Sequence, residues 1–149
     1  MEGELRSDME ANNINMSENW LKWNPIDIPK GEYIVTSFTQ DKNGVKILLD
    51  DEKHAVEVFF DGVPLLIRQA MEGIRMRTWG EIQDKYHDKS YFRHHFFFLV
   101  KNSLLTEWAV EEGAGFYERE EISHYCIVTS EELIDILATF EPEIKVTSV

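Results

Sequence analysis

The sequence has a single cysteine, Cys126, in 149 residues. An intramolecular disulfide is therefore impossible, and a zinc site built from several cysteines is excluded as well. No stretch approaches the roughly 18 consecutive apolar residues of a membrane-spanning helix. The first residues, Met1 to Leu5, lack the basic start and apolar run of a secretion signal. These absences predict a cytoplasmic protein in a reducing compartment.

Positive charge is also scarce, because 15 Lys and Arg residues face 28 Asp and Glu residues, for a formal net charge of −13. Such a balance repels nucleic acids and anionic membranes and attracts basic proteins. The deficit is uneven: residues 68–95 hold six bases and four acids, whereas residues 107–121 hold six acids and one Arg. Residues 131–143 add five acids and no base. A basic protein partner is one reading, and an acidic surface that merely keeps the protein in solution is the other.

Common catalytic and nucleotide-binding motifs are missing. The glycines form neither Gly-x-Gly-x-x-Gly nor a Walker loop, and no Gly-x-Ser-x-Gly or His-Glu-x-x-His occurs. His94 and His95 are adjacent, so on a strand they would point to opposite faces and could not share a metal. A site would need His87 or His124 with carboxylates supplied by the fold. The sequence predicts no catalytic residue, no cofactor and no metal.

The composition is that of a folded chain, with 43% hydrophobic and 12% aromatic residues, and its length predicts one core. Residues 1–19 have no sustained period and are expected to form a flexible or partly helical leader. Residues 20–149 are expected to form a single α+β domain. Trp20 and Trp23 are expected to anchor the leader by packing into this domain, and an exposed binding patch is the alternative.

Strand signals dominate the first half of the chain. Residues 31–39 are rich in strand formers, and Asn43-Gly44 is typical of a tight hairpin turn. With strands over 45–49 and 55–60, this pattern predicts a three-stranded antiparallel meander. Residues 63–77 fit a short helix or a strand equally well.

The second half is expected to begin with a short helix over 79–87, which starts at the capping box Thr78 to Glu81. The apolar run Phe96 to Val100 predicts a buried strand. After a turn at 101–103, a further strand is expected over 104–109. Cys126 lies in the strongest strand candidate, where a free cysteine usually serves as a small buried apolar residue.

The stretch from Ile122 to Val146 reads as a strand, a helix and a return strand, that is, a βαβ-like unit. The helix is predicted over 131–140, because its apolar residues share one helical face and Thr129 or Ser130 can cap it. Pro142 would end it. The whole pattern predicts an α+β fold with a strongly bent antiparallel sheet or partly open barrel of six to seven strands. A C-terminal helix plugs it, and one other short helix completes the fold.

Acidic residues alternate with aromatic ones in one stretch of the chain. This mixture is typical of protein interfaces, where aromatic anchors are desolvated and carboxylates pair with basic partners. The alternative is that the aromatics belong to the core and the glutamates to a solvated face. The predicted partner-binding residues are Glu107, Trp108, Glu111, Glu112, Phe116, Tyr117, Glu118, Glu120 and Glu121.

Residues 124–129 (His-Tyr-Cys-Ile-Val-Thr), 132–137 (Glu-Leu-Ile-Asp-Ile-Leu) and Glu141-Pro142 together carry a family likeness. They resemble the C-terminal signature of small immunity proteins, the antitoxins encoded beside bacterial polymorphic toxins. Residues 31–62 and 96–108 are similar to members from Gram-positive bacteria.

The likeness runs from about Trp20 to Val149, and its motifs are structural. It implies a cytoplasmic protein without enzymatic activity that binds and blocks a cognate toxin domain, commonly a nuclease. Because a nuclease needs a positive groove for its substrate, a chain of charge −13 is its electrostatic complement. The resemblance implies no site residues, so the acidic and aromatic stretch remains the predicted interface, with glutamates in place of phosphates.

Two alternatives belong to other classes of protein. One is a small hydrolase-type enzyme that uses His94 or His124 with carboxylates. The other is a structural or adaptor domain that self-associates, as a homodimer, through the segment around Trp20 and Trp23.

Overall fold

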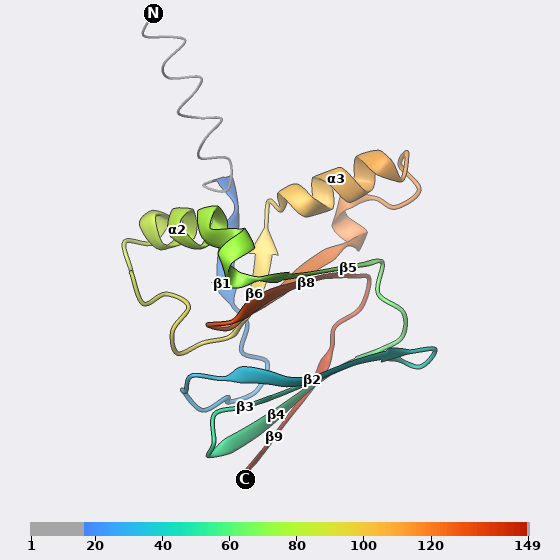
Figure 1. The fold of residues 1–149 in the computed structure, drawn as a ribbon. Helices are drawn as coiled ribbons and strands as arrows, with labels where there is room; N and C mark the ends of the chain where they lie inside the picture. Colours follow the sequence, from blue (N-terminus) through green and yellow to red (C-terminus); the bar gives the residue numbers. More distant parts are fainter. Residues whose placement is uncertain (1–16, 149) are drawn as a thin grey trace, which may run out of the picture.

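The computed structural model describes residues 17–148, so most of the predicted leader lies outside the described residues. In this part of the chain nine strands form two antiparallel sheets (Figure 1). The α+β class is therefore confirmed, but the sheets are not closed into a barrel, and there are more strands than predicted.

The five-stranded sheet has the order β1-β6-β7-β8-β5. Its strands are β1 (Asn19–Lys22), β5 (Leu66–Met71), β6 (Phe97–Lys101), β7 (Ser123–Val128) and β8 (Glu132–Ala138). The four-stranded sheet has the order β2-β3-β4-β9. Its strands are β2 (Ile34–Asp41), β3 (Gly44–Asp50), β4 (His54–Asp61) and β9 (Glu143–Ser148). The helices are α2 (Met76–Lys85) and α3 (Leu104–Glu112), with 3₁₀ turns η2 (Glu72–Arg75) and η3 (Arg119–Glu121).

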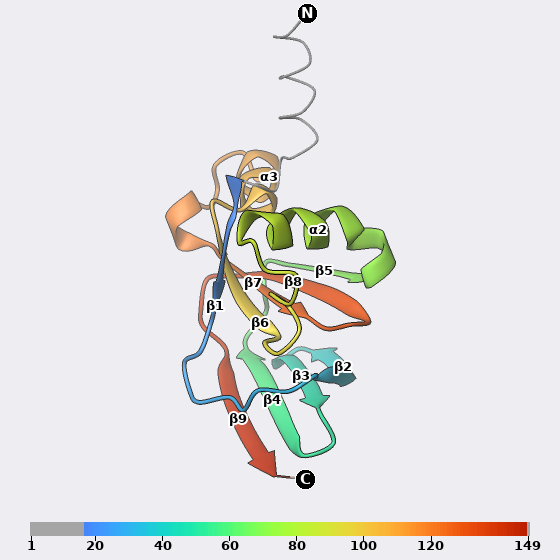
Figure 2. The same ribbon diagram turned by 90° about the vertical axis from the view of Figure 1, so that its left-hand side faces the viewer.

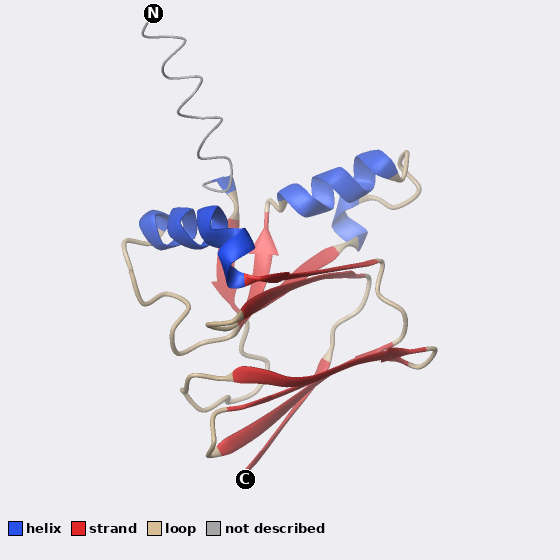
Figure 3. Ribbon diagram, in the orientation of Figure 1, coloured by secondary structure: helices blue, strands red, loops and turns tan. Residues whose placement is uncertain are grey.

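The two sheets stack face to face, and both α-helices lie on the outer face of the five-stranded sheet (Figure 3). Figure 2 shows the same layers from the side, with β9 at one edge of the four-stranded sheet. The main core fills the space between the sheets and includes Ile47, Val58, Phe97 and Ile134. A second core lies between the five-stranded sheet and α2, which contributes Ile82.

The predicted meander is confirmed as β2, β3 and β4, joined by consecutive antiparallel pairings. The hairpin at Asn43-Gly44 requires glycine, because Gly44 has φ +144° and an added Cβ would lie 2.0 Å from the carbonyl oxygen of Phe60. The buried strand predicted at Phe96 to Val100 is β6.

The C-terminal helix predicted over 131–140 is wrong, and so is the βαβ-like unit: this segment is β8, which pairs with β7 as a hairpin. Leu133 through Ala138 are all buried, since β8 lies inside the sheet with both faces covered. A strand buried on both faces reads as a continuous apolar run that also fits a helical face. The Oγ1 of Thr129 does accept the amides of Glu131 and Glu132, but it closes a tight turn.

The strand predicted over 104–109 is also wrong, because these residues begin α3. The helix starts where the Oγ of Ser103 accepts the amide of Thr106 at 3.0 Å. A carboxylate oxygen of Glu18 accepts the amide of Leu104 at 2.9 Å. The undecided segment 63–77 contains β5 and the start of α2.

The short helix predicted over 79–87 is present as α2, which runs from Met76 to Lys85. The capping box predicted at Thr78 to Glu81 is wrong, because both residues lie inside the helix and Arg75 is its N-cap residue. Trp20 is fully buried in β1, as expected, and its ring contacts Phe92 edge to face at 5.7 Å. Trp23 is half-buried and packs on Phe97 at 5.0 Å. Within residues 17–148, no helix is long and apolar enough to cross a membrane.

Candidate functional site

The structure places the predicted partner-binding residues on α3, on the loop that follows it and on η3, next to one end of β7. Seven of the nine residues are exposed, and only Glu107 and Tyr117 are half-buried. The aromatic side chains do not belong to the core: Trp108 is 52% exposed and Phe116 is 81% exposed. We call these nine residues the acidic-aromatic surface.

Two local interactions organise this surface. Arg119 donates both Nε and Nη2 to the carboxylate of Glu107, the second at 2.7 Å. Hydrogen bonding from Arg119, together with its charge, lowers the pKa of Glu107, so this carboxylate is ionised at neutral pH. Glu118 and Glu121 form a reciprocal capping box around η3, in which the Glu121 carboxylate accepts the amide of Glu118 at 3.0 Å. Glu111 and Glu112 make no ion pair within residues 17–148 and leave their charge to the solvent.

Trp108 also lines a groove of about 680 Å³ between α3 and β5. Leu104 and Leu105 form the helical wall, and Leu66 and Arg68 lie on the strand side. On an α-helix, residues three and four positions apart are neighbours. The apolar wall of α3 is therefore continued beyond Trp108 by the exposed acids at positions 111 and 112.

A buried polar network lies beneath the outer face of the five-stranded sheet. Asp135 in β8 is fully buried, and its carboxylate accepts hydrogen bonds from Arg68 at 2.8 Å and from Arg75 at 2.5 Å. The other oxygen lies 2.8 Å from Nε2 of His124. The Nδ1 of this histidine lies 2.6 Å from the Oγ of Ser103.

The hydrogen-bond directions follow from the available donors. The ionised carboxylate of Asp135 can only accept, so Nε2–H of His124 donates to it. In the neutral imidazole Nδ1 is then an acceptor, and the hydroxyl of Ser103 donates to it while its oxygen accepts the amide of Thr106. Burial alone would raise the pKa of Asp135, but the hydrogen bond from His124 and the nearby positive charges outweigh it and hold that pKa well below its usual range.

The order hydroxyl, imidazole, carboxylate is also that of a nucleophilic triad. Ser103, His124 and Asp135 are only 5%, 2% and 0% exposed, however, and none of them lines a cavity described for this structure. The Ser103 oxygen is occupied as the N-cap of α3. In this arrangement the network ties α3, β7, β8 and β5 together and presents no accessible nucleophile.

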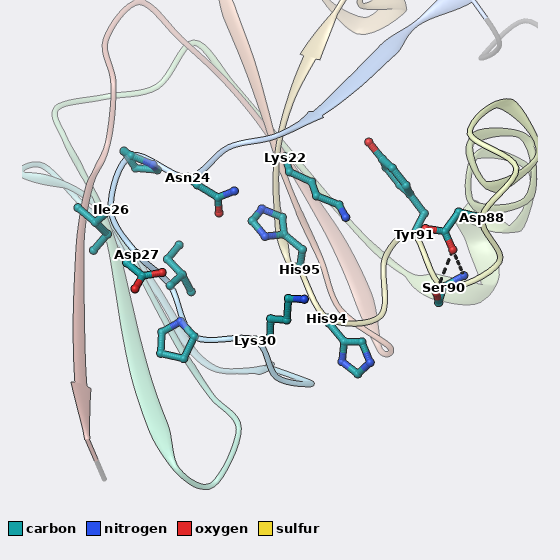
Figure 4. A pocket seen from close by; sticks show the side chains of 13 residues that line it. Lys22, Asn24, Ile26, Asp27, Lys30, Asp88, Ser90, Tyr91, His94 and His95 are labelled. Atoms are coloured by element: carbon teal, nitrogen blue, oxygen red, sulfur yellow. Dashed lines mark hydrogen bonds between the residues drawn. The ribbon is translucent and has the colours of Figure 1, made fainter.

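A cavity of about 770 Å³ lies between the loop after β1 and the loop before β6 (Figure 4). Lys22 and Lys30 enter from opposite walls, with the ring of His95 near them. Burial lowers the pKa of His95, and its Nε2 lies 2.6 Å from the carbonyl oxygen of Phe97, to which it donates. Asp88 accepts both the amide and the hydroxyl of Ser90. Positive and negative charges balance in the lining, so the cavity suits a polar molecule and shows no bias toward an anion or a cation.

The two histidine positions considered from the sequence thus have different environments. His94 and His95 lie in the loop before β6, not on a strand, and line the cavity. His124 lies apart from them in the buried network. Within residues 17–148, no group of three His, Cys, Asp or Glu side chains is placed to hold a metal ion.

Sequence reasoning missed Asp135, Arg68 and Arg75 as members of one site. Asp135 lies in a segment of five acids without a base, a pattern that indicates a solvent-exposed face. The one available signal is a lone acid between Ile134 and Ile136, because a charge inside an apolar run of strand length needs a buried partner. Comparisons of the chain with protein-family models, curated proteins and solved structures gave no match.

Proposed function

We propose that this chain is an immunity protein that binds and blocks a basic toxin domain, of nuclease type, through the acidic-aromatic surface. One observation carries the proposal: Trp108 and Phe116 are exposed among exposed glutamates instead of packing in the core. Large aromatic side chains lose a favourable burial energy when they stay in water, and they recover it when a partner covers them.

The electrostatics support the same partner. The segment 107–121 contains one basic residue, Arg119, which forms an ion pair with Glu107. The remaining glutamates therefore present a negative field. A nuclease carries a positive groove for phosphates, which this field complements. In the proposed mechanism the glutamates occupy phosphate positions, Trp108 and Phe116 anchor the contact, and the bound protein excludes the nucleic acid.

The test is neutralisation in cells that co-express the chain with the toxin domain encoded beside it. The double variant Glu111→Lys with Glu112→Lys should lose protection, because four units of charge change in the field that meets the toxin. A matched control is Glu141→Lys with Glu143→Lys, which makes the same charge change at exposed positions near β9. If the 111/112 variant protects as well as the parent chain, the acidic-aromatic surface is not the interface.

Binding measured with purified proteins gives a second readout. Affinity for the toxin domain should fall as salt rises, because the contact is between opposite charges. Phe116→Ala should weaken binding by about tenfold or more if this ring is an anchor. Its 81% exposure makes an effect on folding small.

The enzyme alternative now rests on the order Ser103, His124, Asp135. For these groups to act, the chain would have to expose a serine that is 5% accessible. Hydrolysis of a small activated ester that is abolished by Ser103→Ala in a folded variant would support an enzyme. Toxin neutralisation retained by the same variant would support the immunity function.

A further inference from the structure

β5 is an edge strand of the five-stranded sheet, and its free edge is unprotected. β5 is the last strand in the sheet order and pairs only with β8. The amide of Glu72 donates to the carbonyl of Glu131 at 2.9 Å. Because alternate residues of an antiparallel strand face its neighbour, Ile67, Gln69 and Met71 direct their amides away from β8. Within residues 17–148, β5 pairs with no strand other than β8, so no neighbouring strand accepts these three amides.

The other three sheet edges carry features that discourage pairing. β1 has only four residues, and β2 is interrupted by a bulge between Val35 and Ser37. β9 carries charged residues, Glu143 and Lys145, along its six positions. The one charged side chain of β5 is Arg68, which is tied to Asp135. β5 is therefore the edge of the described structure that is best suited to accept another strand.

Exposed apolar side chains gather around this edge. Among residues 17–148, five of the ten exposed large apolar residues belong to β5, to the turn and helix after it, or to α3, so the apolar exposure is concentrated there. These five are Met71 (64% exposed), Ile74 (78%), Met76 (56%), Leu104 (37%) and Trp108 (52%). The groove of about 680 Å³ between β5 and α3 lies among them.

We infer that a second copy of this chain pairs with β5 in an antiparallel, two-fold symmetric arrangement centred on Gln69. In this register a pair of main-chain hydrogen bonds joins the two Gln69 residues. The amide of Met71 in each copy donates to the carbonyl of Ile67 in the other. The amide of Ile67 likewise donates to the carbonyl of Met71 in the other copy, so all three outward amides have acceptors. The two sheets then join into a single continuous sheet.

The side chains of β5 are complementary to themselves in this register. Ile67 lies opposite Met71 of the second copy, and the two Gln69 amides face each other. On the other face Arg68 lies opposite the small Ala70. Apolar cross-strand pairs stabilise a sheet, and no like charges lie directly opposite each other here. Such self-complementarity is what a two-fold interface requires.

Exposed apolar residues also select a second copy. The antiparallel arrangement brings α3 of one copy beside η2 and the start of α2 in the other, because α3 adjoins the Leu66 end of β5. Leu104 and Trp108 of one copy then cover Ile74 and Met76 of the other, and all four side chains are exposed in the single chain. Because Trp108 also belongs to the acidic-aromatic surface, this dimer and the proposed toxin complex exclude each other. The dimer uses β5 and does not depend on Trp20, which is buried.

Analytical ultracentrifugation of the purified chain tests the dimer. Measurements run from micromolar to about 0.2 mM chain, at about 0.15 M salt, where a Debye length of about 8 Å screens the net charge. A concentration-dependent dimer is expected. Gln69→Pro removes the amides that join the two copies and should raise the dimer dissociation constant at least about tenfold. Gln69→Ala retains the amide and should leave that constant within about threefold.

Proline at an outward position removes no hydrogen bond between β5 and β8. Urea unfolding of the variant checks that it folds. A second variant avoids backbone strain: Met71→Lys places a charge opposite Ile67 and should also weaken the dimer. Its control is Ile26→Lys, which makes the same change at a 40% exposed loop position.

The register is tested by Gln69→Cys. Directly opposed residues of a hydrogen-bonded pair have Cα atoms about 5.5 Å apart, within the range that a disulfide spans. Mild oxidation should therefore crosslink Gln69→Cys chains readily and Met71→Cys chains poorly, and the native Cys126 is buried and does not interfere. A monomer at every concentration overturns the inference and leaves the edge to a different partner. A dimer that is insensitive to both Gln69→Pro and Met71→Lys overturns it too.

Discussion

Replacing Asp135 by Asn tests the buried network most directly. The carboxylate is fully buried and compensates Arg75, whose side chain is only 12% exposed, and Arg68, whose side chain is 44% exposed. Removing one member of a buried charge pair costs about 3–5 kcal/mol. Arg68 can turn to solvent and contributes little to that cost, and Asn keeps the volume and one acceptor. We therefore expect Asp135→Asn to lower the free energy of unfolding by about 3 kcal/mol.

Urea unfolding followed by tryptophan fluorescence measures the change, and an unchanged m-value shows that only stability has altered. The exposed Glu131, next to the same strand, supplies the control Glu131→Gln, which should stay within about 0.5 kcal/mol. In the Asp135→Asn background, Arg75→Met should restore part of the loss, because it removes the charge left without a partner. A loss below about 1 kcal/mol for Asp135→Asn would refute the assignment of the network as a main stabilising element.

The same residue makes stability depend on pH. The pKa of Asp135 in the folded chain lies below its unfolded value of about 3.9. Its ionised form therefore stabilises the fold fully above that value, and this stabilisation is lost as pH falls through the folded pKa. The difference in stability between the parent chain and Asp135→Asn should shrink below about pH 4. A difference that stays constant down to pH 2 would contradict the assigned direction of the shift.

Two further predictions concern neighbours of this network. Ser103→Ala removes the cap of α3 and the hydroxyl at His124, and should lower the free energy of unfolding by about 1–2 kcal/mol in urea; Ser103→Thr, which keeps a hydroxyl, should lose less. Burial raises the pKa of the Cys126 thiol well above its usual range, so a thiol reagent should label the native chain slowly and the urea-unfolded chain at once. Immediate labelling of the native chain would mean that β7 is more open than its packing indicates.

Several elements could be predicted because their signals are local. Asn43-Gly44 has the backbone freedom that a two-residue hairpin needs, and alternating residues flank it, so the meander of β2, β3 and β4 follows. The run Phe96 to Val100 has the length and content of a buried strand. The exposed acids at 111 and 112 also follow from sequence, because glutamates without a base nearby remain in water.

Two elements were mispredicted for the same reason. The segment 131–140 carries helical spacing and a capping residue, yet it is β8, and 104–109 has strand-like content, yet it begins α3. Local preference in both cases is weak compared with the energy of burying whole faces. β8 lies between β7 and β5, with the second sheet on one side and the helical layer on the other, and nothing local in the sequence specifies those neighbours.

The sequence by itself determined the hairpin turn at Asn43-Gly44, the buried strand near Phe96 to Val100, the presence of a single cysteine, the absence of common catalytic motifs, and a net charge of −13. These depend on residue type and short spacing alone. Only the tertiary structure decided that Asp135 is a buried partner of Arg68, Arg75 and His124, that Trp108 is exposed, and that β5 ends a sheet. Each of these depends on contacts between residues far apart in the chain, and it is burial by distant segments that sets whether a charge is paired or solvated.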